Sequence, residues 1–190
     1  MKEHSIANKI RELRTAKHLS LEKLAKLSGL TKGYLSRIEN SPRPPPIYTL
    51  SKISTALGVN VSKLLSDFDD SDLPETVEIT ITRNAEHAIT DGRGTPYGYV
   101  YEALAPRKLD KNMESFLITV SFESKTDFQH EGEEFLYVLE GKLEFFFKDQ
   151  SYILEKGDCV YFESAFPHGG KSLGNEPAKI MIVIYSYKRM

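Results

Sequence analysis

Residues 20–39 read SLEKLAKLSGLTKGYLSRIE, and this stretch decides the fold of the first third of the 190-residue chain. Apolar side chains recur at helical spacing on both sides of Gly29, which can supply a tight turn between two helices. Ser20 and Thr31 stand where helix N-caps belong, because each can accept a hydrogen bond from a backbone N–H of the first turn. The pattern predicts a helix, a glycine turn and a second helix in close contact with the first.

Helical spacing continues on both sides of this pair. The further apolar positions are Ile6, Ile10, Leu13, Leu50, Ile53 and Leu57. Pro42, Pro44, Pro45 and Pro46 end the third helix, because proline cannot continue the hydrogen-bond ladder, and Gly58 stands where the fourth ends. A short fifth helix is expected over 61–65. Five helices in about 60 residues predict a compact bundle.

Charge divides the chain into two unlike parts. Residues 1–66 carry 12 Lys and Arg against four Asp and Glu, a net charge of +8, whereas residues 67–190 carry 13 basic and 23 acidic residues, a net charge of −10. Of 10 Tyr and 10 Phe, only Tyr34 and Tyr48 precede residue 67. A polyanion is attracted to the first part and repelled by the second.

After residue 76 the apolar period changes to two, with β-branched and aromatic runs between glycine-bearing turns. The pattern predicts strands over 77–83, 97–104, 116–122, 135–140, 143–147, 159–162 and 178–187. Seven or more short strands at this spacing favour a closed or sandwiched β-barrel. Residues 67–76 are acidic and predict a linker. We therefore expect an α+β chain, with an all-α domain over 1–66 and an all-β domain over 77–190.

The outer face of the second helix of the pair carries the groups that a DNA-reading helix needs. Arg37 and Lys32 can donate to guanine O6 and N7, while Thr31 and Ser36 can bond to phosphates or base edges. Backbone N–H groups at the two helix starts suit phosphates. We expect DNA contacts from Ser20, Lys23, Thr31, Lys32, Gly33, Tyr34, Ser36 and Arg37. The alternative is a packing module with a solvated basic face.

Residues 6–65 resemble the XRE family of phage-repressor-like helix-turn-helix domains, most specifically in TKGYLSRIEN at 31–40 and the proline-rich loop that follows. The resemblance implies a lambda-repressor-like bundle that binds a double-stranded DNA operator as a homodimer, with half-sites roughly 34 Å apart. Leu21 departs from the family pattern, because many members carry a phosphate-contacting glutamine at that place.

In the acidic part, Phe128, His130 and Glu134 are separated by even numbers and share one face of a regular strand. A straight strand would hold His130 and Glu134 roughly 13 Å apart, too far for one metal with ligands at about 2.1 Å. The chain must turn between them, and Gly132 is where it can. His168, expected at the end of another strand, is the third candidate. Two imidazoles and one carboxylate suit Fe(II), and also Zn, Mn or Ni, whereas the alternative is an ordinary acidic turn with hydrogen-bonded histidines.

Two segments, HEGEEFLYVLEG at 130–141 and GDCVYFESAFPH at 157–168, look like the two motifs of the cupin superfamily. The resemblance covers roughly residues 97–187 and implies a jelly-roll barrel that holds a site in its interior. The metal ligands that it implies are His130, Glu134 and His168.

The chain departs from the cupin motifs at two places. The histidine that normally stands two residues before His130 is replaced by Phe128, and the asparagine expected shortly after His168 is absent. A four-ligand metal site is therefore excluded. A three-ligand metal site and a metal-free ligand pocket both remain open.

Further side chains could line a pocket in this barrel. Tyr99 and Tyr101 alternate on one face of a predicted strand, and Arg93 precedes it. A guanidinium and phenols that face an apolar cavity suit a small anion such as a carboxylate, phosphate or phosphonate. We expect effector contacts from Arg93, Tyr99, Tyr101 and Phe128. Ordinary core and rim packing is the alternative.

Two functions of different classes fit the chain. It resembles, from end to end, bacterial transcriptional regulators that join an XRE helix-turn-helix to a cupin sensor, which need no catalysis. The rival is an iron oxygenase, because epoxidases acting on hydroxypropylphosphonate share the domain order, and their phosphonate-binding arginine and a tyrosine match Arg93 and Tyr101 in place. The complete DNA-reading helix and the charge of the basic part favour a non-enzymatic regulator.

The sequence also bears on the compartment. Cys159 is the one cysteine and cannot form an internal disulfide. No apolar run approaches the roughly 18 residues of a membrane span, and the N-terminus lacks the pattern of a signal peptide. We therefore expect a cytoplasmic protein without a membrane partner.

Overall fold

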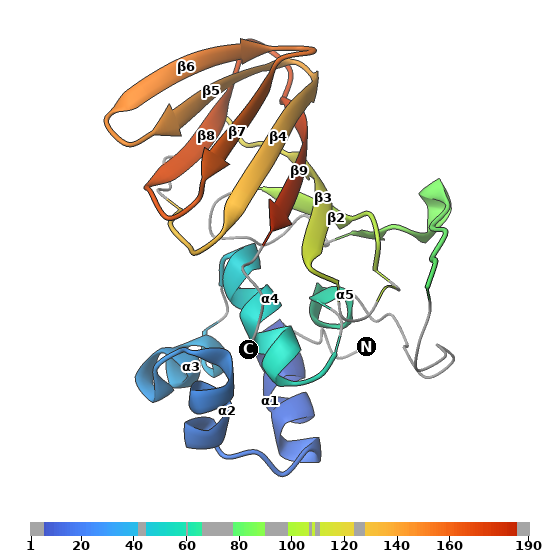
Figure 1. Ribbon diagram of the computed structural model, residues 1–190, viewed down its shortest axis with the longest axis vertical. Helices are drawn as coiled ribbons and strands as arrows, with labels where there is room; N and C mark the ends of the chain where they lie inside the picture. Colours follow the sequence, from blue (N-terminus) through green and yellow to red (C-terminus); the bar gives the residue numbers. More distant parts are fainter. Residues whose placement is uncertain are drawn as a thin grey trace.

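The computed structural model describes residues 6–41, 45–59, 61–65, 78–89, 99–106, 108, 111–123 and 128–185. Helices come first and strands follow, which confirms the α+β class (Figure 1). The helices are α1 (Ile6–Ala16), α2 (Leu21–Ser28), α3 (Lys32–Glu39), α4 (Ile47–Ala56) and α5 (Val61–Leu65). The expected linker at 67–76 lies outside the described residues. None of the helices in the described ranges is long and apolar enough to cross a membrane.

Capping side chains set the bounds of α2 and α3. The Ser20 hydroxyl accepts a hydrogen bond from the Lys23 N–H, and the Thr31 hydroxyl accepts one from the Tyr34 N–H, both at 3.1 Å. Gly29 ends α2 in the left-handed region, with φ at 67°, where a residue without Cβ avoids strain. Both predicted N-caps and the glycine turn are confirmed, so α2 and α3 form a helix-turn-helix.

The strands form two antiparallel sheets. One sheet has the order β1 (Ala88–Ile89), β2 (Val100–Ala103), β3 (Met113–Thr119), β9 (Lys179–Tyr185), β4 (Glu133–Glu140) and β7 (Cys159–Glu163), and the other has the order β6 (Gln150–Glu155), β5 (Lys142–Phe147) and β8 (His168–Leu173). Along β4 and β9 every second side chain is buried, as the alternating sequence pattern predicts. Inward-facing residues of both sheets enclose an apolar interior, which confirms the all-β cupin-type domain.

The strand prediction was wrong in three respects. Residues 78–83 alternate like a strand, yet they lie outside both sheets, and Ile79 and Ile81 are exposed. Strands β1, β6 and β8 were not predicted, because β1 has only two residues, β6 is exposed along most of its length and β8 contains two adjacent glycines. His168 begins β8, whereas the sequence suggested that it ends a strand.

Gly170 explains why β8 lacks a typical strand sequence. A Cβ at this position would lie 3.0 Å from the Leu143 side chain and 3.2 Å from the Glu144 carbonyl oxygen on β5. Because β8 pairs directly with β5, the close approach favours glycine over a β-branched residue.

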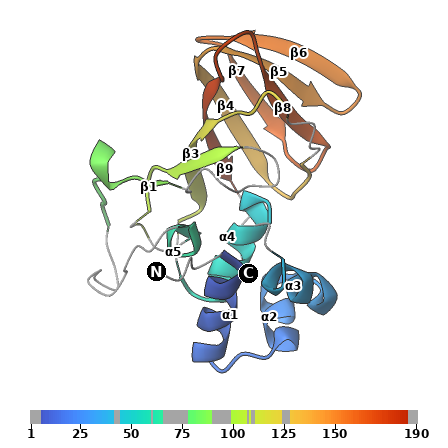
Figure 2. The same cartoon turned by 180° about the vertical axis from the view of Figure 1, so that it is seen from behind.

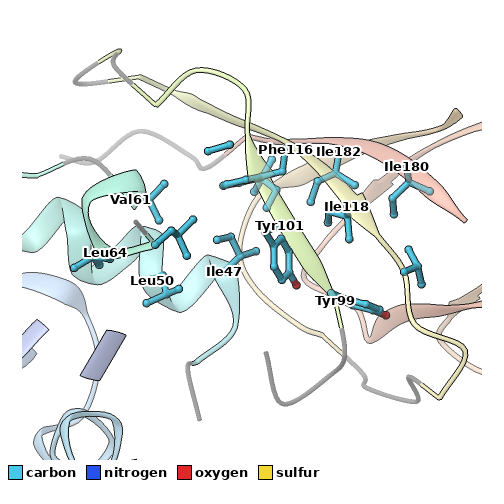
Figure 3. Close-up of a cluster of buried hydrophobic side chains, with 14 of the residues drawn as sticks. Ile47, Leu50, Val61, Leu64, Tyr99, Tyr101, Phe116, Ile118, Ile180 and Ile182 are labelled. Atoms are coloured by element: carbon cyan, nitrogen blue, oxygen red, sulfur yellow. The ribbon is translucent and has the colours of Figure 1, made fainter. Parts of the chain in front are cut away.

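Helix α4 joins the helical part to the barrel. In both views it extends from the helix-turn-helix towards the sheets (Figures 1 and 2). Ile47 at its start lies beside Tyr101 of β2, with Leu50 one turn further along the helix (Figure 3). The buried apolar side chains of the two parts belong to a single cluster. Apolar burial therefore connects the helix-turn-helix to the barrel interior.

Candidate functional site

The first candidate site is the exposed face of α3. Leu35 and Ile38 are buried against the other helices, which turns the opposite face outward. The residues predicted to contact DNA divide by exposure: Ser20, Lys23, Thr31, Lys32, Gly33 and Arg37 are exposed, and Tyr34 and Ser36 are half-buried. The helix-turn-helix thus presents the whole predicted set at the start and outer face of α3 and at the start of α2.

A salt bridge holds α3 against α1. The Arg14 guanidinium contacts both carboxylate oxygens of Glu39, through Nε at 2.6 Å and Nη2 at 2.9 Å, and its Nη1 donates to the Leu19 carbonyl oxygen at 2.9 Å. Glu39 is buried, and its hydrogen bonds raise the pKa of Arg14 above the ordinary value. This two-point contact fixes the last turn of α3, and with it the direction of the exposed face.

The second candidate site is a cluster of three buried side chains in the barrel. One ligand atom from each of His130, Glu134 and His168 lies within 4.8 Å of the others. The His130 Nε2 lies 2.5 Å from the Glu134 Oε1, and the His168 Nε2 lies 3.4 Å from the same oxygen. Gly132, with φ at 114°, turns the chain between His130 and β4, as predicted. The three groups therefore form a cluster that could hold a metal ion.

The hydrogen bonds around the cluster orient both imidazoles towards the carboxylate. The Nδ1 of His168 contacts the Phe166 carbonyl oxygen at 2.9 Å, and the Nδ1 of His130 contacts the Glu131 carbonyl oxygen at 3.3 Å. A carbonyl only accepts, so each Nδ1 is placed to donate to it. Nε2 faces Glu134, and it is the atom that would bind a metal in place of its proton. Two Nε2 atoms and one carboxylate at such separations fit a divalent transition metal at about 2.1 Å from each.

The carboxylate of the cluster is held in its charged form. Burial by itself raises the pKa of Glu134, but the hydrogen bonds with His130 and His168 outweigh it and lower the pKa to about 2. The site therefore keeps an anionic ligand ready for a cation at neutral pH.

A cavity of about 70 Å³ adjoins the cluster. Its walls are almost entirely apolar and come from both sheets. Tyr99, Tyr101 and Phe128, which were predicted as effector contacts, line it, whereas Arg93 lies outside the described residues. The Tyr99 hydroxyl donates to the Gly170 carbonyl oxygen at 2.6 Å, so this phenol also stabilises the wall.

The sequence analysis missed the contribution of the helical part to this cavity. Pro46, Ile47 and Tyr48, at the start of α4, also line it. The Tyr48 ring stacks on the His130 ring, with 4.1 Å between centroids and 18° between planes. The one available signal was that Tyr48 is one of two aromatic residues in a helical part that otherwise has none.

Comparison with known families gives two matches, one in the helical part and one in the barrel. A helix-turn-helix model matches residues 10–64, and a cupin domain model matches residues 118–185. The first covers the helices from within α1 to α5, and the second covers the strands that carry the His130, Glu134 and His168 cluster.

Two curated relatives show how far the similarity extends. The HTH-type transcriptional regulator PuuR of Escherichia coli is 28% identical over 180 residues, which is 94% of this chain and 92% of PuuR. The control protein C.MunI of a Mycoplasma species is 41% identical over 63 residues, which is 33% of this chain and 85% of C.MunI. The first relative matches both parts of the chain, and the second has the length of the helical part alone.

Two solved structures align with nearly the whole chain. A helix-turn-helix family transcriptional regulator from Vibrio cholerae aligns with a TM-score of 0.56 and 27% identity, over 97% of this chain and 96% of its own. Hydroxypropylphosphonic acid epoxidase from S. wedmorenis aligns with a TM-score of 0.46 and 24% identity, over 95% of this chain and 96% of its own. At this level the second match carries no information on function.

Proposed function

Since the chain belongs to the XRE-type helix-turn-helix family of transcriptional regulators and carries a cupin domain, we propose that it binds an operator as a homodimer and that its barrel senses a small anionic effector with the help of a divalent metal. The observation that carries this proposal is the exposed, capped and salt-bridged α3. A helix presented in this way fits a DNA major groove.

Within the DNA-binding site, the residues divide by the groups that they reach. Arg37 and Lys32 donate to base edges, and Lys23 with the N–H groups at the start of α2 contacts phosphates. Two copies of α3 in a dimer read half-sites one helical turn apart, roughly 34 Å. Symmetry therefore predicts a nearly palindromic operator.

Within the barrel, His130 and His168 would hold the metal through Nε2, and Glu134 through a carboxylate oxygen. The metal supplies a positive charge that anchors an anionic group in an otherwise apolar cavity. Tyr99, Tyr101 and Phe128 then contact the apolar body of the effector. The effector changes DNA affinity to the extent that it binds the two arrangements of the dimer unequally.

The test is an anisotropy titration of the full chain with duplex DNA from upstream of its own gene, at two salt concentrations. We expect one sequence to bind much more tightly than an unrelated duplex, and affinity to fall steeply as salt rises, because bound phosphates release counterions. Equal affinity for both duplexes would contradict the proposal that the chain is a sequence-specific regulator. Light scattering of the complex reports whether two chains bind each duplex.

A second function is favoured by one observation, the two-histidine, one-carboxylate cluster itself. This set of ligands is the one that non-haem iron oxygenases use. Oxygen uptake by the iron-loaded protein that depends on an added small phosphonate would support the enzyme. Specific DNA binding without such uptake supports the regulator.

A further inference from the structure

The cavity in the barrel is partly built by the DNA-binding domain. Pro46, Ile47 and Tyr48 lie at the N-terminal end of α4, and all three line the cavity beside the metal-ligating cluster. The helix-turn-helix model ends at residue 64, so α4 belongs entirely to the DNA-binding part of the chain. A ligand in the barrel therefore contacts the DNA-binding domain directly.

Tyr48 of α4 contacts the metal-ligating cluster directly. One face of its ring stacks on His130 at 4.1 Å, while the Lys52 Nζ, one turn along α4, lies 4.8 Å from the ring centroid. The ammonium group is attracted to the aromatic ring. The Tyr48 ring thus contacts both a residue of the cluster and a cation of its own helix.

Metal binding changes the distance between His130 and Glu134. The His130 Nε2 and the Glu134 Oε1 are only 2.5 Å apart, whereas two ligand atoms on one metal at about 2.1 Å stand roughly 3 Å or more from each other. A metal bound by both groups must part them. One of these two groups is the imidazole on which Tyr48 stacks.

The small volume of the cavity also points to a movement of Tyr48. Its volume of about 70 Å³ is about half of the ~150 Å³ that a benzene-sized ligand occupies in a dry protein cavity. It therefore holds a metal ion and a few small groups, but a larger organic anion needs more space. Pro46, Tyr48 and Phe128 are the half-buried residues among those that line the cavity, and of these three Tyr48 is the one whose ring stacks on His130.

Apolar packing carries a displacement of α4 onwards. Ile47 packs beside Tyr101 on the barrel side, and Leu50 continues into the core of the helical bundle (Figure 3). Helix α4 packs against α2, which in turn packs against α3. Because closely packed interiors rearrange between discrete states, a shift at Tyr48 biases the position of the helix-turn-helix.

We propose that Tyr48 closes the effector cavity and couples its occupancy to DNA binding. Binding of a metal ion, and then of a small carboxylate, phosphate or phosphonate beside it, displaces this ring and moves α4. The inference rests on the proposed regulator function. It adds that the signal passes within one chain, from His130 through Tyr48 to α4.

The test compares operator affinity of the full chain with chelator and with Zn²⁺, in wild type, Tyr48→Ala and Tyr48→Phe. We expect Zn²⁺ to change the wild-type Kd about fivefold or more, within the usual range of coupling between two sites. Tyr48→Phe keeps the stacked ring and should keep this ratio. Tyr48→Ala removes the ring and should bring the ratio to near one. Tyr152→Ala, an exposed tyrosine on β6, is the matched control and should keep the ratio.

A second readout does not depend on DNA. The chain contains no tryptophan, so Tyr48→Trp and Tyr152→Trp each have a single emitting tryptophan. Zn²⁺ should shift the emission of Tyr48→Trp and leave that of Tyr152→Trp unchanged. If Tyr48→Ala does not fold, as judged by circular dichroism, Tyr48→Leu replaces it.

The outcomes separate the two proposals. Suppose that the wild type binds the operator and responds to Zn²⁺. An equal response in Tyr48→Ala, or no emission shift in Tyr48→Trp, then overturns the role of Tyr48 and leaves the regulator function intact. Wild-type protein that ignores the operator, or binds it without any response to Zn²⁺, overturns the proposed sensing function and the role of Tyr48 with it.

Discussion

Arg14 of α1 and Glu39 at the end of α3 form a buried, two-point salt bridge between the first helix and the helix predicted to read DNA. Both side chains are largely removed from solvent, at 13% and 4% exposure. Breaking a buried pair by removing one partner leaves an uncompensated charge, which costs about 3–5 kcal/mol. We therefore expect Arg14→Met to lower the free energy of unfolding by about that amount, as measured by urea denaturation.

The double variant Arg14→Met/Glu39→Leu distinguishes an unpaired charge from lost packing. It removes both charges and keeps similar side-chain volume, so it should recover most of the loss. Lys142→Met is the control, because its ion pair with Glu155 is exposed and contributes less than about 1 kcal/mol. Equal destabilisation in the single and double variants would contradict the electrostatic explanation.

Arg37 and Lys23 should affect DNA binding in different ways. Arg37→Ala removes a donor to base edges, so discrimination between the operator and single-base variants should fall by about 1–3 kcal/mol. Lys23→Ala removes a phosphate contact, so it should weaken all sequences alike and lower the salt slope by about one. Anisotropy titrations at several salt concentrations measure both quantities. Lys156→Ala, in the exposed β6–β7 turn, should change neither. A uniform loss with Arg37→Ala would assign this residue to the backbone instead.

Local signals account for the parts of the molecule that could be predicted. Ser20, Thr31 and Gly29 specify helix boundaries within a few residues, so the helix-turn-helix follows from sequence alone. Gly132 likewise specifies the turn that brings His130 close to Glu134. In these cases the physical cause lies next to the residue that it affects.

Long-range packing accounts for the rest. Nothing in the local pattern of Gly170 indicates a strand, because the glycine is required by the close approach of Leu143 and Glu144 on β5, which lie 27 and 26 residues earlier in the chain. Residues 79 and 81 alternate like a strand but pair with none of the described strands. Tyr48 belongs to a helix by its spacing, and only the packing of α4 on the barrel places it against His130.

Glu134 and Glu133 provide a matched pair for the metal site. Glu134 points into the cavity, whereas the neighbouring Glu133 accepts a hydrogen bond from the Tyr161 hydroxyl on β7. Glu134→Gln removes the anionic ligand, so we expect Zn²⁺ affinity to fall by about 100-fold or more, since even changes beyond the direct ligands cost 10–100-fold. Glu133→Gln should bind Zn²⁺ like the wild type. Isothermal titration of the chelator-treated proteins measures both.

Elemental analysis of protein purified without chelator complements this comparison. Wild type and Glu133→Gln should retain a divalent metal, and Glu134→Gln should lose it. Metal contents that are the same in Glu134→Gln and wild type would show that the cluster is not the binding site.

Protonation of Glu134 should make the stability of the metal-free protein depend on pH. Its pKa is about 2 in the folded chain and 4.5 by the ordinary value for an unfolded one. Since the folded pKa is the lower of the two, ionisation stabilises the fold above pH 4.5, and this contribution is lost as the pH falls towards 2. The wild-type advantage over Glu134→Gln should therefore be constant at neutral pH and shrink by roughly 3 kcal/mol between about pH 4.5 and 2. Urea denaturation in chelator from pH 6 down to pH 3 follows most of this range, and a difference that stays constant throughout would show that the charged carboxylate does not stabilise the fold.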